Sequence, residues 1–162
     1  MFTYEILLNR FNRGYLDRLV EHLPDEELDL QLHPGLHSPR WILAHLAIVA
    51  DYGLKMIDVS TLCPKTWHVA YGPSSQPGTE ARVKPDRTDL LKAIDVGYSQ
   101  LCDVLPTAST ENFSQPHGVA LLAGTPIVTR IDLVCHILTT HFATHLGQLS
   151  SICRLQGRPP LF

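Results

Sequence analysis

Apolar residues recur at intervals of three and four along four stretches of the chain, the spacing that lines one face of an α-helix. The stretches cover residues 3–22, 39–58, 86–105 and 129–157. Turn residues separate them, and the connections after the second and third stretches are long. The pattern predicts an all-α fold. We expect a four-helix bundle with long crossover connections, whose helices need not follow a simple up-and-down order.

Local signals mark several helix ends. Ser38, followed by a proline, predicts the start of the second helix, and either Asp86 or Thr88 can cap the third. Thr129, with an aspartate three residues later, predicts the start of the last helix, and Gly157 predicts its end. The last helix is therefore marked at both ends.

The first helix shows an apolar stripe with polar residues largely on the other side. The stripe consists of Tyr4, Leu7, Leu8, Phe11, Tyr15, Leu19 and His22. Asn9, Arg10, Asp17 and Arg18 fall between them. The pattern predicts that the stripe faces the core and that these polar residues face solvent.

The connections are rich in proline and glycine. The acidic segment 25–29 is compatible with a short helical turn, and the apolar run 119–123 with a hairpin-like crossover. Segment 59–85 shows no regular element and carries two large apolar residues, Trp67 and Tyr71. Long loops inside compact domains are often binding loops, so we expect substrate contacts there, including these two residues. A packed crossover connection is the alternative.

Histidines occupy the apolar stripes of the second and last helices. His141 and His145 are four residues apart, so they lie on one face about 6 Å apart along the axis. His45 takes a position where a leucine would fit, and an unsatisfied buried imidazole costs about 1–3 kcal/mol. Three inward imidazoles leave an open coordination position, as in catalytic metal sites. We therefore expect His45, His141 and His145 to bind a metal ion.

Other kinds of metal site lack their residues. Phe142 stands where an HExxH metalloprotease has its glutamate, and no Glu-x-x-His motif of di-iron bundles occurs. His136 precedes His145 by nine residues, which is about half a turn away on a regular helix. We therefore expect His136 to lie on another face of the last helix. The remaining histidines are interpreted as structural: His22, His33, His37, His68 and His117.

Composition narrows the class of protein. A chain of 162 residues with 44% apolar residues is long enough for one core, so we expect a single domain over residues 1–162. A net charge of -3 gives no support for nucleic-acid binding, and no apolar run is long enough to span a membrane. The four cysteines are scattered without a CxxC pair, which predicts reduced thiols and a cytoplasmic location.

Two segments carry a resemblance to a known family. RWILAHLA contains His45, and HFATHLGQL contains His141 and His145, followed by an arginine and a glycine. With the loop sequence GPSSQPG, these segments make the chain resemble the DinB/YfiT-like superfamily. The resemblance implies a four-helix bundle, commonly a homodimer. It also implies a divalent metal ion (zinc, nickel, manganese or iron) held by residues matching the three histidines.

The resemblance also implies a range of activities. Some relatives transfer low-molecular-weight thiols, one branch isomerises maleylpyruvate with such a thiol, and others are described as metal-dependent hydrolases. We expect a small-molecule substrate and thiol activation ahead of hydrolysis, because HFATH holds no carboxylate to deprotonate a water molecule. Asp51 and Asp58 are the nearest candidates for such a base. A non-catalytic bundle that binds a small molecule or a protein is the alternative.

Gln148 follows the second histidine of the motif closely. The Gln148 amide can either hydrogen-bond a metal-binding imidazole without contacting the metal ion itself, or cap a neighbouring loop. The sequence leaves these two roles open.

Overall fold

The computed structural model describes residues 2–75 and 83–161. Its long helices are α1 (Thr3–Glu21), α2 (Pro39–Met56), α4 (Arg87–Val104) and a last helix in three parts. These parts are α6 (Arg130–His136), a π-helical turn (Ile137–His141) and α7 (Phe142–Leu155). No strand occurs among the described residues, which confirms the all-α fold.

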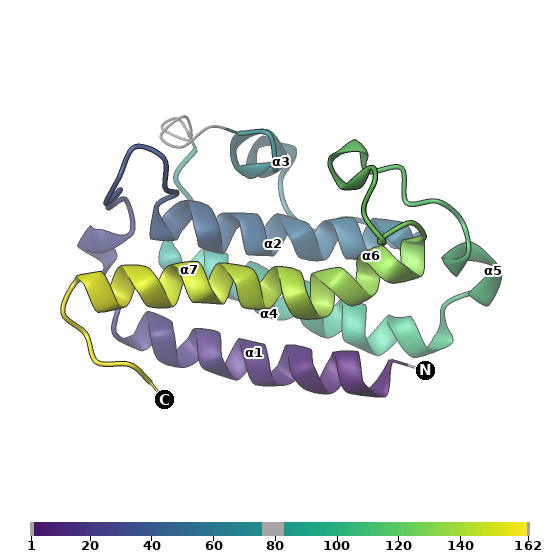
Figure 1. Ribbon diagram of the computed structural model, residues 1–162, viewed down its shortest axis with the longest axis horizontal. Helices are drawn as coiled ribbons and strands as arrows, with labels where there is room; N and C mark the ends of the chain where they lie inside the picture. The colour runs from purple at the N-terminus through teal and green to yellow at the C-terminus, as the bar shows by residue number, and fades with distance from the viewer. Residues whose placement is uncertain (1, 76–82, 162) are drawn as a thin grey trace.

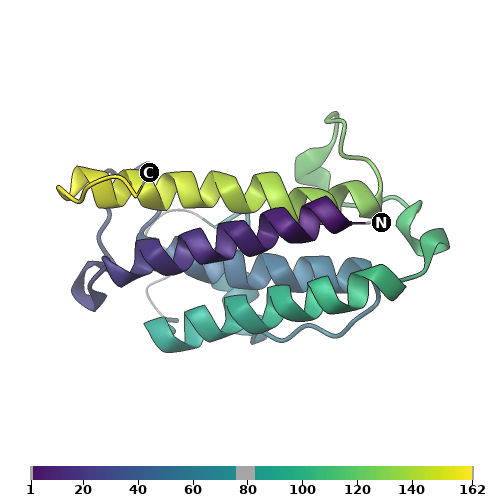
Figure 2. The same cartoon turned by 90° about the horizontal axis from the view of Figure 1, so that it is seen from below.

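The long helices lie side by side in a bundle (Figures 1 and 2). α1 and the last helix run in one direction, and α2 and α4 run in the other (Figure 1). Because α2 and α4 are parallel, the chain must cross the length of the bundle between them. This topology accounts for the long connection after the second helix.

The helix ends follow the sequence signals. The Ser38 hydroxyl accepts a hydrogen bond from the Trp41 N–H, and the Asp86 carboxylate accepts one from Asp89 N–H. Thr129 and the side chain of the residue three positions later form a reciprocal capping box. Gly157 has a positive φ of 82°, and the bonds around it close a Schellman motif. The predicted caps are confirmed.

The buried face of α1 differs from the predicted one. Tyr4, Leu7, Leu8 and Phe11 are exposed. The buried residues are Asn9, Asn12, Leu16, Leu19 and Val20. The prediction was wrong for the first half of α1 because two asparagines belong to its inner face, where a pattern of apolar residues does not reveal them. It was also wrong for His22, which is exposed at the end of the helix.

The π turn explains these buried asparagines. Asn9 Nδ2 donates to the Leu138 carbonyl at 3.1 Å, and Asn12 Nδ2 donates to the Thr139 carbonyl at 3.5 Å. Both acceptors lie in the π turn, where the regular i to i+4 ladder of the helix is interrupted. The amides of α1 thus pair with backbone carbonyls of the last helix, which satisfies these polar groups inside the bundle.

Small residues allow α2 and α4 to approach closely. A Cβ atom added at Gly97 would lie 2.8 Å from the Ala50 Cβ, and one at Gly53 would lie 2.6 Å from a Leu101 methyl group. Gly147, by contrast, has no atom within 4 Å of such a position among the described residues. The close helix packing therefore depends on Gly53 and Gly97.

The long connection after α2 contains a helix, α3 (Lys65–Tyr71), which the sequence pattern did not predict. Its start after Pro64 and the spacing of Trp67 and Tyr71 by four residues were the available signals. The fully buried Asp51 carboxylate anchors this connection by accepting bonds from two backbone N–H groups, those of Leu62 and Cys63. The GPSSQPG stretch continues beyond the described residues at positions 76–78.

The other connections hold short elements. The acidic segment forms the predicted turn, a 3₁₀ turn at Asp25–Glu27. The connection before the last helix holds α5 (Thr110–Phe113) and a 3₁₀ turn at Ala120–Leu122. A single antiparallel bridge between Pro116 and Thr129 is its only hairpin-like feature among the described residues.

Two of these connections cover one side of the bundle. α3 and the segment between α5 and α6 both lie on the side of α2 and α7 that faces away from α1 (Figure 1).

No helix among residues 2–75 and 83–161 is long and apolar enough to cross a bilayer.

Candidate metal centre

His45, His141 and His145 meet inside the bundle. His45 comes from α2, His141 ends the π turn and His145 lies on the first turns of α7. One ring nitrogen of each lies within 4.8 Å of those of the other two. The convergence predicted from the sequence is present, and these three histidines could hold one ion.

Two of the rings are held by hydrogen bonds at Nδ1. His45 Nδ1 lies 2.7 Å from the Tyr71 carbonyl oxygen, and His145 Nδ1 lies 2.8 Å from Gln148 Oε1. Because a carbonyl oxygen only accepts, a proton on each Nδ1 completes these bonds and leaves the Nε2 lone pair available. Bonds of this kind orient the histidine ligands of metal sites.

Further contacts fix the position of His45. The Trp41 indole stacks on the His45 ring with the centroids 4.5 Å apart, and Trp41 Nε1 donates to the Ser75 hydroxyl at 2.8 Å. His45 Nε2 lies 3.3 Å from His141 Nε2, while His141 Nδ1 is buried without a hydrogen-bond partner among the described residues. Contacts with the protein therefore hold His45 in position, but they leave part of the hydrogen-bonding capacity of His141 unused.

Burial keeps these imidazoles neutral. Desolvation and the neighbouring His145 lower the pKa of His45 to about 3. Desolvation, His145 and His45 lower the pKa of His141 to about 2, and desolvation also lowers the pKa of His145. At neutral pH all three rings are uncharged, which is the form that binds metal ions.

The residues present fit a divalent ion of the first transition row. Neutral imidazole suits zinc, nickel and iron, and three such ligands leave a coordination position for a substrate. The buried, unpartnered Nδ1 of His141 and the proximity of two Nε2 atoms show that protein hydrogen bonds alone do not complete this cluster.

His136 lies beside the cluster, contrary to the sequence-based prediction. Its ring centroid is 5.5 Å from that of His141, and its Nδ1 lies 2.6 Å from the Thr140 hydroxyl oxygen. The prediction assumed about 100° per residue, which puts His136 half a turn from His145. The π turn takes up one extra residue in between, so His136 rotates towards the face of His141.

The loop residues predicted to contact substrate have different surroundings. Tyr71 is fully buried, and its backbone carbonyl orients His45. Trp67 is half-buried on α3 and packs against the core. A direct contact of either side chain with substrate stays a prediction.

Most of the other histidines have structural partners. His68 Nε2 lies 2.9 Å from the Asp51 carboxylate, and His33 Nδ1 accepts the Gly35 N–H. His117 accepts the Val119 N–H at Nδ1 and donates to the Ile127 carbonyl from Nε2. His117 therefore shapes the segment that begins at residue 117.

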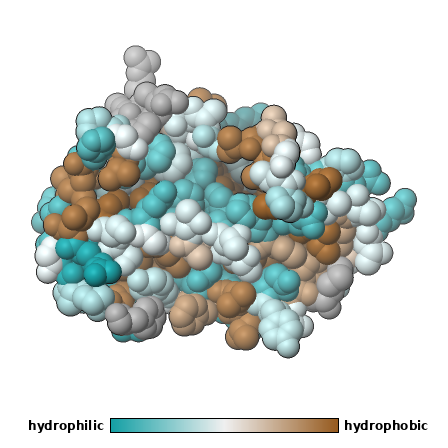
Figure 3. Space-filling model, in the orientation of Figure 1, coloured by the Kyte–Doolittle hydropathy of each residue, from teal (hydrophilic) through white to brown (hydrophobic). Residues whose placement is uncertain are grey.

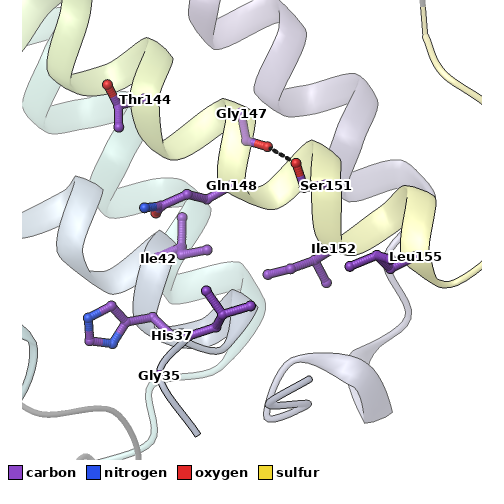
Figure 4. Close-up of a pocket in the computed structure, with 10 residues that line it drawn as sticks. Gly35, His37, Ile42, Thr144, Gly147, Gln148, Ser151, Ile152 and Leu155 are labelled. Carbon is purple, nitrogen blue, oxygen red and sulfur yellow. Dashed lines mark hydrogen bonds between the residues drawn. The ribbon is translucent and has the colours of Figure 1, made fainter. Parts of the chain in front are cut away.

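A cavity of about 510 Å³ lies beside Gln148, between α7 and the start of α2. Figure 4 shows Gln148 and Ile42 facing it from the two helices, with Ile152 and Leu155 further along α7. The Gly147 carbonyl accepts a bond from the Ser151 hydroxyl at its edge (Figure 4). Gln148 thus lines this cavity and also hydrogen-bonds His145 of the histidine cluster.

The fold and the cluster define a helical bundle that gathers three neutral imidazoles from its second and last long helices. A family model described as the DinB superfamily matches residues 9–149, and the chain belongs to this superfamily. No curated protein matches the chain.

Replacing Gln148 with leucine is expected to weaken zinc binding by about 10- to 100-fold, because the change removes the acceptor that orients His145. Competition with a chromophoric chelator measures the affinity. The matched control is Gln156→Leu, which alters an exposed glutamine at the end of α7. Equal affinities for Gln148→Leu and the unaltered protein would show that the bond does not tune the site.

Proposed function

We propose that the protein is a metal-dependent enzyme that activates a low-molecular-weight thiol against a small electrophile. His45, His141 and His145 hold the metal ion. When bound, a divalent ion supplies Lewis-acid chemistry that lowers the pKa of a coordinated thiol or water molecule. The observation that carries the proposal is the gathering of three neutral imidazoles beside an apolar cavity of about 370 Å³.

The absence of a nearby base favours a thiol over water. No aspartate or glutamate among the described residues lines the cavity that contains His45 and His141. Asp51 is occupied by backbone N–H groups and His68, and the exposed Asp58 accepts a bond from Asn112. A thiol has a solution pKa near 8.5, so it needs less help to ionise than water does.

The protein's own thiols are poor nucleophiles. Burial and the neighbouring Asp51 raise the pKa of Cys63 to about 12, and burial with Glu5 raises the pKa of Cys135 to about 11. Burial also raises the pKa values of Cys102 and Cys153. All four are free cysteines that stay protonated at neutral pH, which supports an external thiol as the nucleophile.

Metal-loaded protein is expected to conjugate a low-molecular-weight thiol to an electrophile such as monochlorobimane. Fluorescence follows the reaction across a panel of thiols, and ester and amide substrates are tested beside it without thiol. The expected activity requires thiol and metal together and is lost in the His145→Ala variant. Turnover of an ester that ignores thiol and is lost in the same variant would establish hydrolysis instead.

A non-catalytic bundle is the competing function, since His45 and His141 lie close enough to share a hydrogen bond without a metal ion. It predicts no turnover with any of these substrates and a melting temperature that chelators do not change. Both results together would contradict the enzyme proposal.

We also propose a homodimer, on a separate observation. Tyr4, Leu7, Leu8 and Phe11 expose between 49% and 78% of their surface on one side of α1. Figure 3 shows brown, apolar side chains along the lower edge of the molecule, where α1 lies. Such a stripe is unusual on an isolated surface helix.

Sedimentation equilibrium is expected to give twice the chain mass for the protein. The double substitution Leu7→Glu and Phe11→Glu is expected to give the monomer mass, because it puts charges on the exposed stripe. Val69→Glu, another exposed apolar position, is the control. A monomer mass for the unaltered protein would contradict the homodimer.

A further inference from the structure

The cavity beside the histidine cluster has mostly apolar walls. It has a volume of about 370 Å³ and lies between α2, α6 and the segment from residue 117 to residue 122. Val49 and Met56 line it from α2, and Leu133 and Ile137 line it from the last helix. Figure 3 shows brown side chains on the upper right, over the segment around residues 120–122. The size and walls suit a small apolar ligand.

The charge in this cavity has one sign. Lys55 is the only Lys, Arg, Asp or Glu residue among the described residues that line it. No carboxylate of the described residues forms an ion pair with Lys55. An ammonium group at the mouth of an apolar cavity attracts an anionic group and disfavours a cationic one.

His136 adds a polar group to the same cavity. The π turn brings it to the cavity wall beside His141, and Thr140 occupies its Nδ1. Nε2 is therefore the ring nitrogen left for a ligand. π turns inside α-helices occur often at functional sites, and the two buried asparagines of α1 donate hydrogen bonds to carbonyls of this one.

We propose that this cavity binds an electrophile with an apolar body and an anionic group, such as a carboxylate. Lys55 contacts the anionic group, His136 hydrogen-bonds the ligand, and the apolar walls hold its body next to the histidine cluster. The inference rests on the proposed function, because it names the class of the second substrate. The roles of Lys55 and His136 are in binding, so they are testable without turnover.

Isothermal titration of zinc-loaded protein with a matched pair of probes tests the proposal. The probes are 3-phenylpropionate and 3-phenylpropanamide, which share a body and differ in charge. The unaltered protein is expected to bind the acid at least about fivefold more tightly than the amide. Lys55→Gln is expected to remove most of this preference, and Lys55→Arg is expected to keep it.

Controls separate the cavity from the metal ion and from general charge. Lys92→Gln removes one exposed lysine on α4 and is expected to change neither affinity. His136→Leu is expected to weaken binding of the acid severalfold with the zinc content unchanged by elemental analysis. A preference for the acid that persists in Lys55→Gln would show that zinc alone binds the carboxylate, and it would overturn the proposal.

The experiment also distinguishes this inference from the proposed function. Selective, Lys55-dependent binding without turnover in the thiol panel would support the anionic ligand. If chelators also leave the melting temperature unchanged, the enzyme proposal would be contradicted. Turnover with no preference between charged and neutral electrophiles, and no effect of Lys55→Gln, would support the enzyme proposal and contradict the anionic ligand.

Discussion

Replacing His141 or His145 with alanine is expected to weaken zinc binding by more than about a hundredfold. Loss of a group that only orients a ligand costs 10- to 100-fold, so loss of a ligand itself costs more. Elemental analysis after dialysis and competition with a chelator measure the loss. His22→Ala, which removes an exposed histidine of the chain, is the control and is expected to retain the metal.

The same site links metal to stability. An ion present at a hundredfold excess over its dissociation constant stabilises the folded state by about 2.7 kcal/mol. Adding a chelator is therefore expected to lower the melting temperature of the unaltered protein and of His22→Ala, but not that of His145→Ala. Equal shifts in all three proteins would place the metal elsewhere.

The metal-free protein is expected to lose stability as the pH falls from about 6.5 to 4.5. The folded state holds the pKa of His45 at about 3 and that of His141 at about 2, chiefly through burial. In the unfolded chain a histidine has a pKa of about 6.5. Below pH 6.5 these histidines bind protons in the unfolded state but not in the folded state. The free energy of unfolding that is present above pH 6.5 is therefore lost on acidification.

The expected slope is about 1.4 kcal/mol per pH unit for each such histidine. Urea unfolding in the presence of a chelator measures the free energy at each pH. His45→Gln is expected to reduce the slope by one histidine's share, whereas His22→Gln, at an exposed position, serves as the control for the loss of an imidazole. An unchanged slope in His45→Gln would show that His45 does not remain neutral in the folded state.

Local signals in the sequence were sufficient for the long helices and for the ends that carry caps. Caps such as Ser38 and Thr129 act within one turn, so neighbouring residues decide them. The common face of His141 and His145 was also predictable from the sequence, because only one turn of regular α-helix separates these two residues. His45 was recognisable as a polar residue in an apolar stripe, which needs a partner wherever the helix packs.

Sequence patterns failed where a contact between distant segments changes a helix. The buried asparagines of α1 pair with carbonyls about 130 residues later, at Leu138 and Thr139, so their inward position depends on the last helix. The interruption of the ladder by the π turn in turn brings His136 beside His141. A sequence pattern based on 3.6 residues per turn predicts neither the inward asparagines nor the position of His136.

The surroundings of the histidines were likewise decided by tertiary structure. Gln148 lies one turn after His145, so its hydrogen bond was open to prediction, although the sequence left an alternative. The Tyr71 carbonyl that orients His45 belongs to a helix in the long connection, and Asp51 holds the start of that connection against α2. The sequence by itself determined the long helices and the three histidines on their inner faces, because periodicity and caps are local. Only the tertiary structure decided the neighbours of these histidines, because those contacts join segments that are far apart in the chain.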